Sequence, residues 1–196
     1  MSMSTLRKAL DEIYIILCEV DSYFTTIFNP GLIRTEIEEF MHGFELYPNE
    51  EICELYQWSN GTQSEETFFP SYSFNSLAEN LDMYEMLREV DGYTNQFWKS
   101  GWFPICNCDD SYYFIDCGNS FTQLSNVYFY RTDIGIDATV AFPSLTSMMQ
   151  GIAECHREGI YLVERLDIPD FPYSLVTCNE VDEARIFAKY SPESSC

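Results

Sequence analysis

The spacing of apolar side chains changes along this chain, and that change restricts the fold more than any single motif does. Apolar residues recur every three or four positions in 5–28 and 145–155, which predicts a long N-terminal helix over about 5–28 and a later helix. Residues 112–117 and 126–131 are instead dense in aromatic and β-branched residues, which predicts strands. Helices first, strands in the middle and helices afterwards indicate an α+β fold with a single mixed or antiparallel sheet flanked by helices.

The composition fits one folded domain over residues 1–196 that ends in a helical extension over about 179–196. The chain is 46% apolar and 16% aromatic, which is too high for a disordered protein. Ten Lys and Arg residues against 32 Asp and Glu residues give a formal net charge of −22. Because affinity for phosphate comes mainly from Lys and Arg, we expect no direct binding to nucleic acid or to an anionic membrane. A basic protein partner suits this charge.

The cysteines and the early part of the chain predict a cytoplasmic protein with reduced thiols. Asp11 and Glu12 stand where a signal peptide would need its apolar stretch, and the apolar run 13–18 is far shorter than the ~20 residues that span a bilayer. A chain of this size needs no disulfides to fold, so the eight cysteines are expected to be free. Cys106 and Cys108 lack the second pair of a structural zinc site, and no metal or other cofactor is expected.

Signatures of catalysis are sparse. The sequence has no glycine-rich phosphate loop, no H-E-x-x-H motif and no G-x-S-x-G motif. His42 and His156 fall near the ends of predicted helices, where a cation interacts favourably with the helix dipole. An enzyme would therefore need an active site built from carboxylates alone, and we expect no catalytic residues.

Two pairs of acidic residues are the leading candidates for contact with a partner: Glu65 with Glu66, and Asp109 with Asp110. Both pairs fall in turn-like segments, and binding residues lie on loops more often than on helix faces. Neither pair has a Lys or Arg within several residues, so no neighbour in the sequence neutralises them. The alternatives are that they form solvated turns, or that Asp109 and Asp110 belong to a metal site, although the alternating spacing of a calcium loop is missing.

A series of short motifs resembles the Smi1/Knr4 (SUKH) superfamily. Its N-terminal part consists of Pro30-Gly31, Ile37 with Phe40, Gly43-Phe44, Leu46 with Pro48, Leu55-Tyr56 and Ser59-Asn60-Gly61. Trp102-Phe103-Pro104-Ile105 and the strand-like segment 112–116 are similar to two strands of the same superfamily. The resemblance implies a SUKH-like α+β fold without catalysis. It also implies structural roles, as caps, turns and core, for Pro48, Trp58, Asn60, Gly61, Trp102 and Pro104.

The resemblance further implies a protein-binding function. Bacterial members of the superfamily resemble immunity proteins that neutralise toxins, often nucleases, and the acidic surface predicted above would complement a basic nuclease. We therefore expect a non-catalytic immunity protein that binds a nuclease-type toxin directly. The alternative is an intracellular regulatory or scaffold protein with an unrelated partner, as the fungal members suggest.

Overall fold

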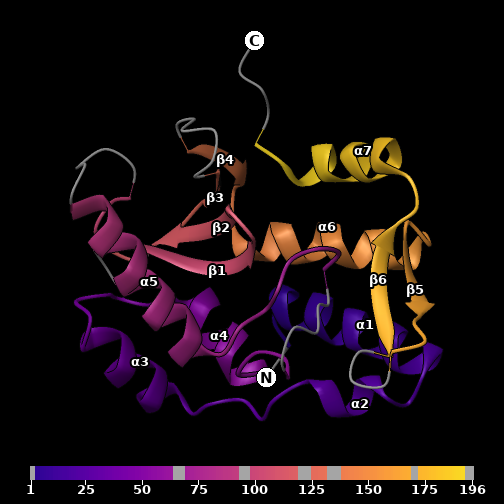
Figure 1. Cartoon of the computed structure of the whole chain (residues 1–196), viewed down its shortest axis with the longest axis horizontal. Helices are drawn as coiled ribbons and strands as arrows, with labels where there is room; N and C mark the ends of the chain where they lie inside the picture. The colour runs from indigo at the N-terminus through magenta and orange to yellow at the C-terminus, as the bar shows by residue number, and fades with distance from the viewer. Residues whose placement is uncertain are drawn as a thin grey trace.

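The elements follow the expected order, with helices before and after the strands (Figure 1). This computed structural model describes residues 3–63, 69–92, 98–118, 125–131, 138–168 and 172–192. The helices are α1 (Thr5–Val20), α2 (Phe24–Ile27), α3 (Arg34–His42), α4 (Glu50–Trp58), α5 (Leu77–Gly92), α6 (Leu145–Arg157) and α7 (Glu180–Tyr190). The strands are β1 (Trp102–Cys108), β2 (Ser111–Asp116), β3 (Val127–Arg131), β4 (Thr139–Phe142), β5 (Tyr161–Arg165) and β6 (Tyr173–Thr177).

Strands β1 to β4 form one antiparallel sheet in chain order, which confirms the predicted α+β class. Strands β5 and β6 pair with each other in a second, two-stranded sheet, so the strands form two sheets rather than the one expected. The reason lies in α6, because its 13 residues carry the chain about 20 Å away from β4 before β5 begins. Figure 1 shows β5 and β6 beside the far end of α6.

The helix predicted over 5–28 is interrupted at Asp21. Helix α1 ends at Val20, and Asp21 adopts an extended conformation with φ −155° and ψ 141°. Its Oδ1 accepts a hydrogen bond from the backbone N–H of Tyr23 at 2.9 Å, and its Oδ2 accepts one from the Tyr173 hydroxyl. An Asp side chain that bonds nearby backbone in this way competes with helix continuation. The apolar spacing continues past the break because α2 buries Phe24 and Ile27.

The main hydrophobic core joins one face of the four-stranded sheet to α1, α4 and α6. Leu10, Ile13 and Leu17 of α1 are fully buried in it, as their helical spacing predicts. Ile115 faces the same core from β2, whereas Phe114 faces the opposite side of the sheet, because successive strand residues alternate in direction. That opposite face carries a second aromatic cluster, which comprises Leu87, Trp98, Trp102, Tyr112, Phe114 and Tyr130.

Cysteine environments lead to a first prediction. Seven cysteines lie in the described residues and none of them forms a disulfide; four, including Cys106, are buried. Burial raises the pKa of the Cys106 thiol to about 12, which makes it unreactive at neutral pH. Among the seven described thiols, only the exposed Cys178 should therefore react fast with a thiol reagent in the native protein, whereas all seven should react in denaturant. Three or four disulfides in protein taken directly from cells would contradict the expectation of reduced thiols.

Candidate functional site

The acidic pair Asp109 and Asp110 forms the two-residue turn between β1 and β2, where Cys108 pairs with Ser111. Both aspartates are exposed. Asp109 has a φ of +45°, a region that L residues rarely adopt and that Asp and Asn tolerate best. The backbone conformation at position 109 therefore favours Asp or Asn. An electrostatic role in binding a partner would not explain this preference.

A cation lies closer to this turn than the sequence indicates. Arg131 of β3 pairs with Ser111, the residue that follows the turn. Arg131 is distant from the turn along the chain and lies near it only because antiparallel pairing places β3 beside β2. Glu65 and Glu66, the other acidic pair, lie outside the described residues, so their role in contacting a partner stays a prediction.

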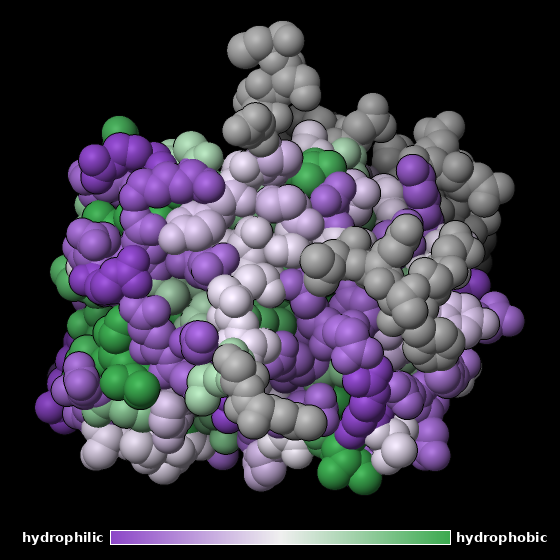
Figure 2. Space-filling model, turned by 180° about the vertical axis from the view of Figure 1, so that it is seen from behind, coloured by the Kyte–Doolittle hydropathy of each residue, from purple (hydrophilic) through white to green (hydrophobic). Residues whose placement is uncertain are grey.

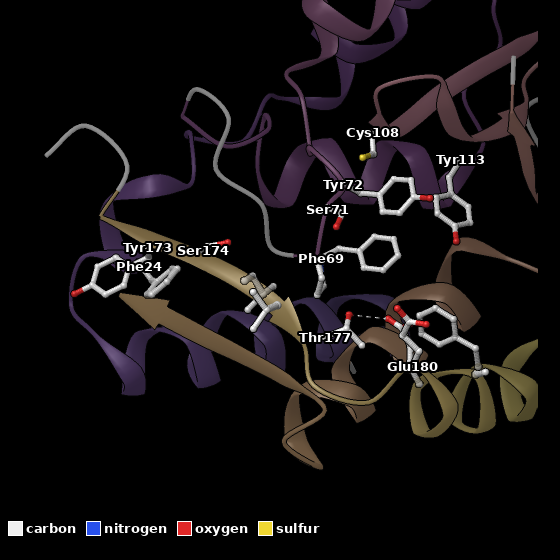
Figure 3. A pocket seen from close by; sticks show the side chains of 16 residues that line it. Phe24, Phe69, Ser71, Tyr72, Cys108, Tyr113, Tyr173, Ser174, Thr177 and Glu180 are labelled. Atoms are coloured by element: carbon white, nitrogen blue, oxygen red, sulfur yellow. Dashed lines mark hydrogen bonds between the residues drawn. The ribbon is translucent and has the colours of Figure 1, made fainter. Parts of the chain in front are cut away.

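A cavity of about 860 Å³ lies on the same side of the molecule as this turn, because Cys108 forms part of its wall. Its remaining walls come from segments that are distant in sequence: Phe24 of α2, residues 69–72, Tyr113 of β2, all of β6 and the first turns of α7. Figure 3 shows Phe69, Tyr72 and Tyr113 on one side and Thr177 and Glu180 opposite them. The motifs did not indicate this cavity, because no single segment contributes more than a fraction of its wall.

The first wall of the cavity is aromatic. The ring of Phe69 stacks on that of Tyr72 with centroids 4.8 Å apart, and Tyr72 contacts Tyr113 at 4.9 Å. Burial raises the pKa of both tyrosines above the usual value of 10, so both remain neutral phenols at physiological pH. Phe187 of α7 lies edge-on to Phe69 at 6.2 Å and closes the wall toward the helix.

The second wall is acidic and belongs to the start of α7. Asn179 caps this helix, because its Oδ1 accepts from the backbone N–H groups of Val181 and Asp182. Glu183 is held by the Tyr161 hydroxyl, which donates to its Oε1 at 2.6 Å, and by Thr177 at 3.4 Å. Burial, together with the bond to Glu183, raises the pKa of Tyr161 far above its usual range, which keeps the proton on the tyrosine.

Helix α7 packs on α6 through apolar side chains, and one carboxylate adds polar contacts between the two helices. Glu154 of α6 is 8% exposed, accepts a hydrogen bond from the Tyr190 hydroxyl at 2.7 Å and forms an ion pair with Lys189. Both contacts lower the pKa of Glu154 below its usual value, and the contact with Lys189 has the larger effect. Because these contacts hold α7 in place, they also hold the acidic wall of the cavity.

This carboxylate leads to a prediction about pH. A group whose native pKa is lowered stabilises the fold above its unfolded pKa, here 4.5, and this stability is lost as the pH falls through the native value. We expect Glu154→Gln to lower the melting temperature by about 2–4 °C at pH 7. The difference between the two proteins should shrink as the pH is lowered below 4.5. A difference that is constant between pH 3 and pH 8 would contradict this account.

The motif residues around the α4–α5 connection make capping and close-packing contacts. Asn60 Oδ1 accepts from the backbone N–H of Leu77 at 2.8 Å and so satisfies the first turn of α5. Gly61 has a φ of +78°, and a Cβ there would lie 2.4 Å from the backbone nitrogen of Ser76. The Trp58 indole donates to Asp11 Oδ1 at 3.0 Å, which ties α4 to α1.

The other three motif residues are buried. Pro48 lies directly before Asn49, which caps α4 by accepting from the Ile52 N–H at 2.9 Å. Trp102 and Pro104 belong to β1, and Pro104 is tolerated there because β1 is an edge strand of the sheet.

Comparison with known families identifies the fold. The family model of the SMI1 / KNR4 family (SUKH-1) matches residues 35–151, more than half of the chain. The chain belongs to the SMI1/KNR4 family. This confirms the resemblance that the motifs showed. The match covers Phe69, Tyr72 and Tyr113 of the aromatic wall, whereas β6 and α7, which complete the cavity in this SMI1/KNR4 protein, lie beyond residue 151. No curated protein matches the chain.

The described part of this SMI1/KNR4 protein contains neither a candidate metal cluster nor a helix that could span a membrane. No group of three or more His, Cys, Asp or Glu side chains there is arranged to hold a metal ion. None of the helices in those residues is both long and apolar enough to cross a membrane. Seen from behind, hydrophobic residues form separate patches among hydrophilic ones (Figure 2).

Proposed function

We propose that the protein is an immunity protein that binds a basic, nuclease-type toxin and neutralises it. The observation that carries this proposal is the combination of SMI1/KNR4 membership, in a family known for immunity proteins, with a formal net charge of −22. A nuclease needs Lys and Arg to bind phosphate, so its substrate-binding surface is basic. An acidic partner covers such a surface by electrostatic complementarity and competes there with nucleic acid.

Opposite charges on the two proteins would also make their association fast. Complementary charge raises association rates to roughly 10⁸–10⁹ M⁻¹s⁻¹ at low salt, compared with about 10⁵–10⁶ M⁻¹s⁻¹ without it. An immunity protein must capture its toxin before the toxin reaches its substrate, so a fast encounter is useful even when other contacts determine the final affinity.

We further propose that Asp109 and Asp110 lie in the contact surface, together with Glu65 and Glu66. Asp109→Asn combined with Asp110→Asn removes both charges and keeps a side chain that tolerates the positive φ of the turn. We expect this double variant to associate with the toxin about three- to tenfold more slowly at low salt, with a weaker salt dependence and an unchanged melting temperature.

A matched control removes two charges elsewhere. Asp82→Asn combined with Glu85→Gln changes two exposed residues on α5. If both double variants slow association equally, the turn contributes only to the general charge, and its place in the contact surface is disproved.

Growth protection tests the function itself. Co-expression of the chain with the toxin encoded by a neighbouring gene should restore growth, whereas an unrelated toxin should remain lethal. Failure to protect against any neighbouring toxin would contradict the proposal and would favour the regulatory or scaffold alternative.

A further inference from the structure

The cavity combines two walls that suit one kind of ligand. On one side lie the faces and edges of Phe69, Tyr72 and Tyr113, which are apolar but carry the negative potential of aromatic rings. On the other side lie the carboxylates of Glu180 and Glu183. Neither Lys nor Arg belongs to the described lining, so the two walls together favour a cation.

The position of Glu183 strengthens this preference. Its Oε1 already accepts from Tyr161 and Thr177, which orients the carboxylate, while Oε2 accepts no hydrogen bond from the described residues. An oriented carboxylate with a remaining acceptor oxygen, near aromatic rings, is a suitable receptor for a donor group. Figure 3 shows the aromatic rings and the acidic wall facing each other across the cavity.

A guanidinium group fits this arrangement better than an ammonium group. It is planar, stacks on aromatic faces and directs several N–H donors toward a carboxylate at the same time. The volume of about 860 Å³ falls within the range of roughly 300–1,000 Å³ that is typical of ligand pockets, so a side chain and part of its loop can enter.

We propose that the cavity receives an arginine side chain of the partner protein. This inference rests on the proposed function, because a basic nuclease exposes arginines at the surface that an immunity protein covers. The acidic wall lies beyond residue 151, outside the part of the chain that the family model matches. The inserted arginine would thus contact aromatic rings inside the matched segment and two carboxylates outside it.

A short peptide tests the cavity without the toxin. Acetyl-Gly-Arg-Gly-amide, added to ¹⁵N-labelled protein, should shift the backbone amide signals of Ser71 and Thr177, and the same peptide with Gln in place of Arg should not. Glu180→Gln combined with Glu183→Gln should weaken binding of the arginine peptide about tenfold. The amide oxygen that Glu183→Gln leaves in place can still accept from Tyr161, so the fold is retained.

The control is again Asp82→Asn with Glu85→Gln, which loses the same charge on α5 and should bind the peptide as the wild type does. Equal weakening in both double variants, shifts spread over the whole surface, or equal shifts with the Gln peptide would each overturn the inference. Because this experiment contains no toxin, its failure is distinguishable from failure of the proposed function, which the growth assay measures.

Discussion

Replacing Trp102 with alanine should lower the free energy of unfolding by about 3–5 kcal/mol. The indole is 8% exposed on the second face of the sheet, and its ring lies 4.3 Å from that of Phe114 and 5.6 Å from that of Trp98. Alanine would remove these contacts and leave a cavity that the surrounding rings cannot fill completely. Because a domain of this kind is typically stable by about 5–15 kcal/mol, the variant should lose a large share of its stability.

Denaturant unfolding measures this loss. Met86→Ala, on α5, is the control, because Met86 is 50% exposed and its truncation should change the unfolding free energy by less than about 0.5 kcal/mol. A Trp102→Ala variant as stable as the wild type would show that the aromatic cluster packs differently, and Trp102 would then become a candidate interface residue.

The second large effect is expected at Glu51, for which Glu51→Gln should cost about 2–4 kcal/mol. Glu51 is 5% exposed, and its two oxygens accept from the backbone N–H groups of Leu145 at 3.1 Å and Thr146 at 3.0 Å. A carboxylate of α4 thus satisfies the N-terminal donors of α6, where it also interacts favourably with the helix dipole. Glutamine has only one acceptor oxygen. Its amide N–H group would therefore face one of the two backbone N–H groups and leave that donor without an acceptor.

The neighbouring residue provides the control for this variant. Glu50 pairs with Arg34, but its side chain is 67% exposed, and an exposed ion pair contributes only about 0–1 kcal/mol. Glu50→Gln should therefore change stability far less than Glu51→Gln. Equal effects of the two variants on the unfolding free energy would contradict the assigned role of Glu51.

Much of the fold follows from local patterns in the sequence. Residues 112–116 of the aromatic segment lie in β2 of the antiparallel sheet, and the spacing of Leu10, Ile13 and Leu17 buries one side of α1. Both signals depend on residues that are close together in the chain. The break at Asp21 was not predicted because the apolar spacing continues into α2, where Phe24 and Ile27 are buried. One of the two hydrogen bonds that hold the Asp21 carboxylate also comes from Tyr173, 152 residues away in the chain.

The candidate site was harder to predict for the same reason. The turn at Asp109 and Asp110 could be expected from its composition, but Arg131 approaches it only through strand pairing. The cavity needs Phe69, Tyr113 and Glu183 together, and each of these belongs to a different segment. Spacing along the chain carries no information about such convergence, which depends on how α7 packs against α6.

The central claim, that this protein neutralises a basic nuclease by direct binding, is tested most directly by titration of nuclease activity. A fixed amount of the toxin encoded by a neighbouring gene is mixed with increasing amounts of the purified chain, and cleavage of nucleic acid is followed. We expect activity to fall linearly to zero at a fixed ratio of chain to toxin, while an unrelated basic ribonuclease stays active. Full cleavage at every ratio, or equal inhibition of both nucleases, would contradict the claim.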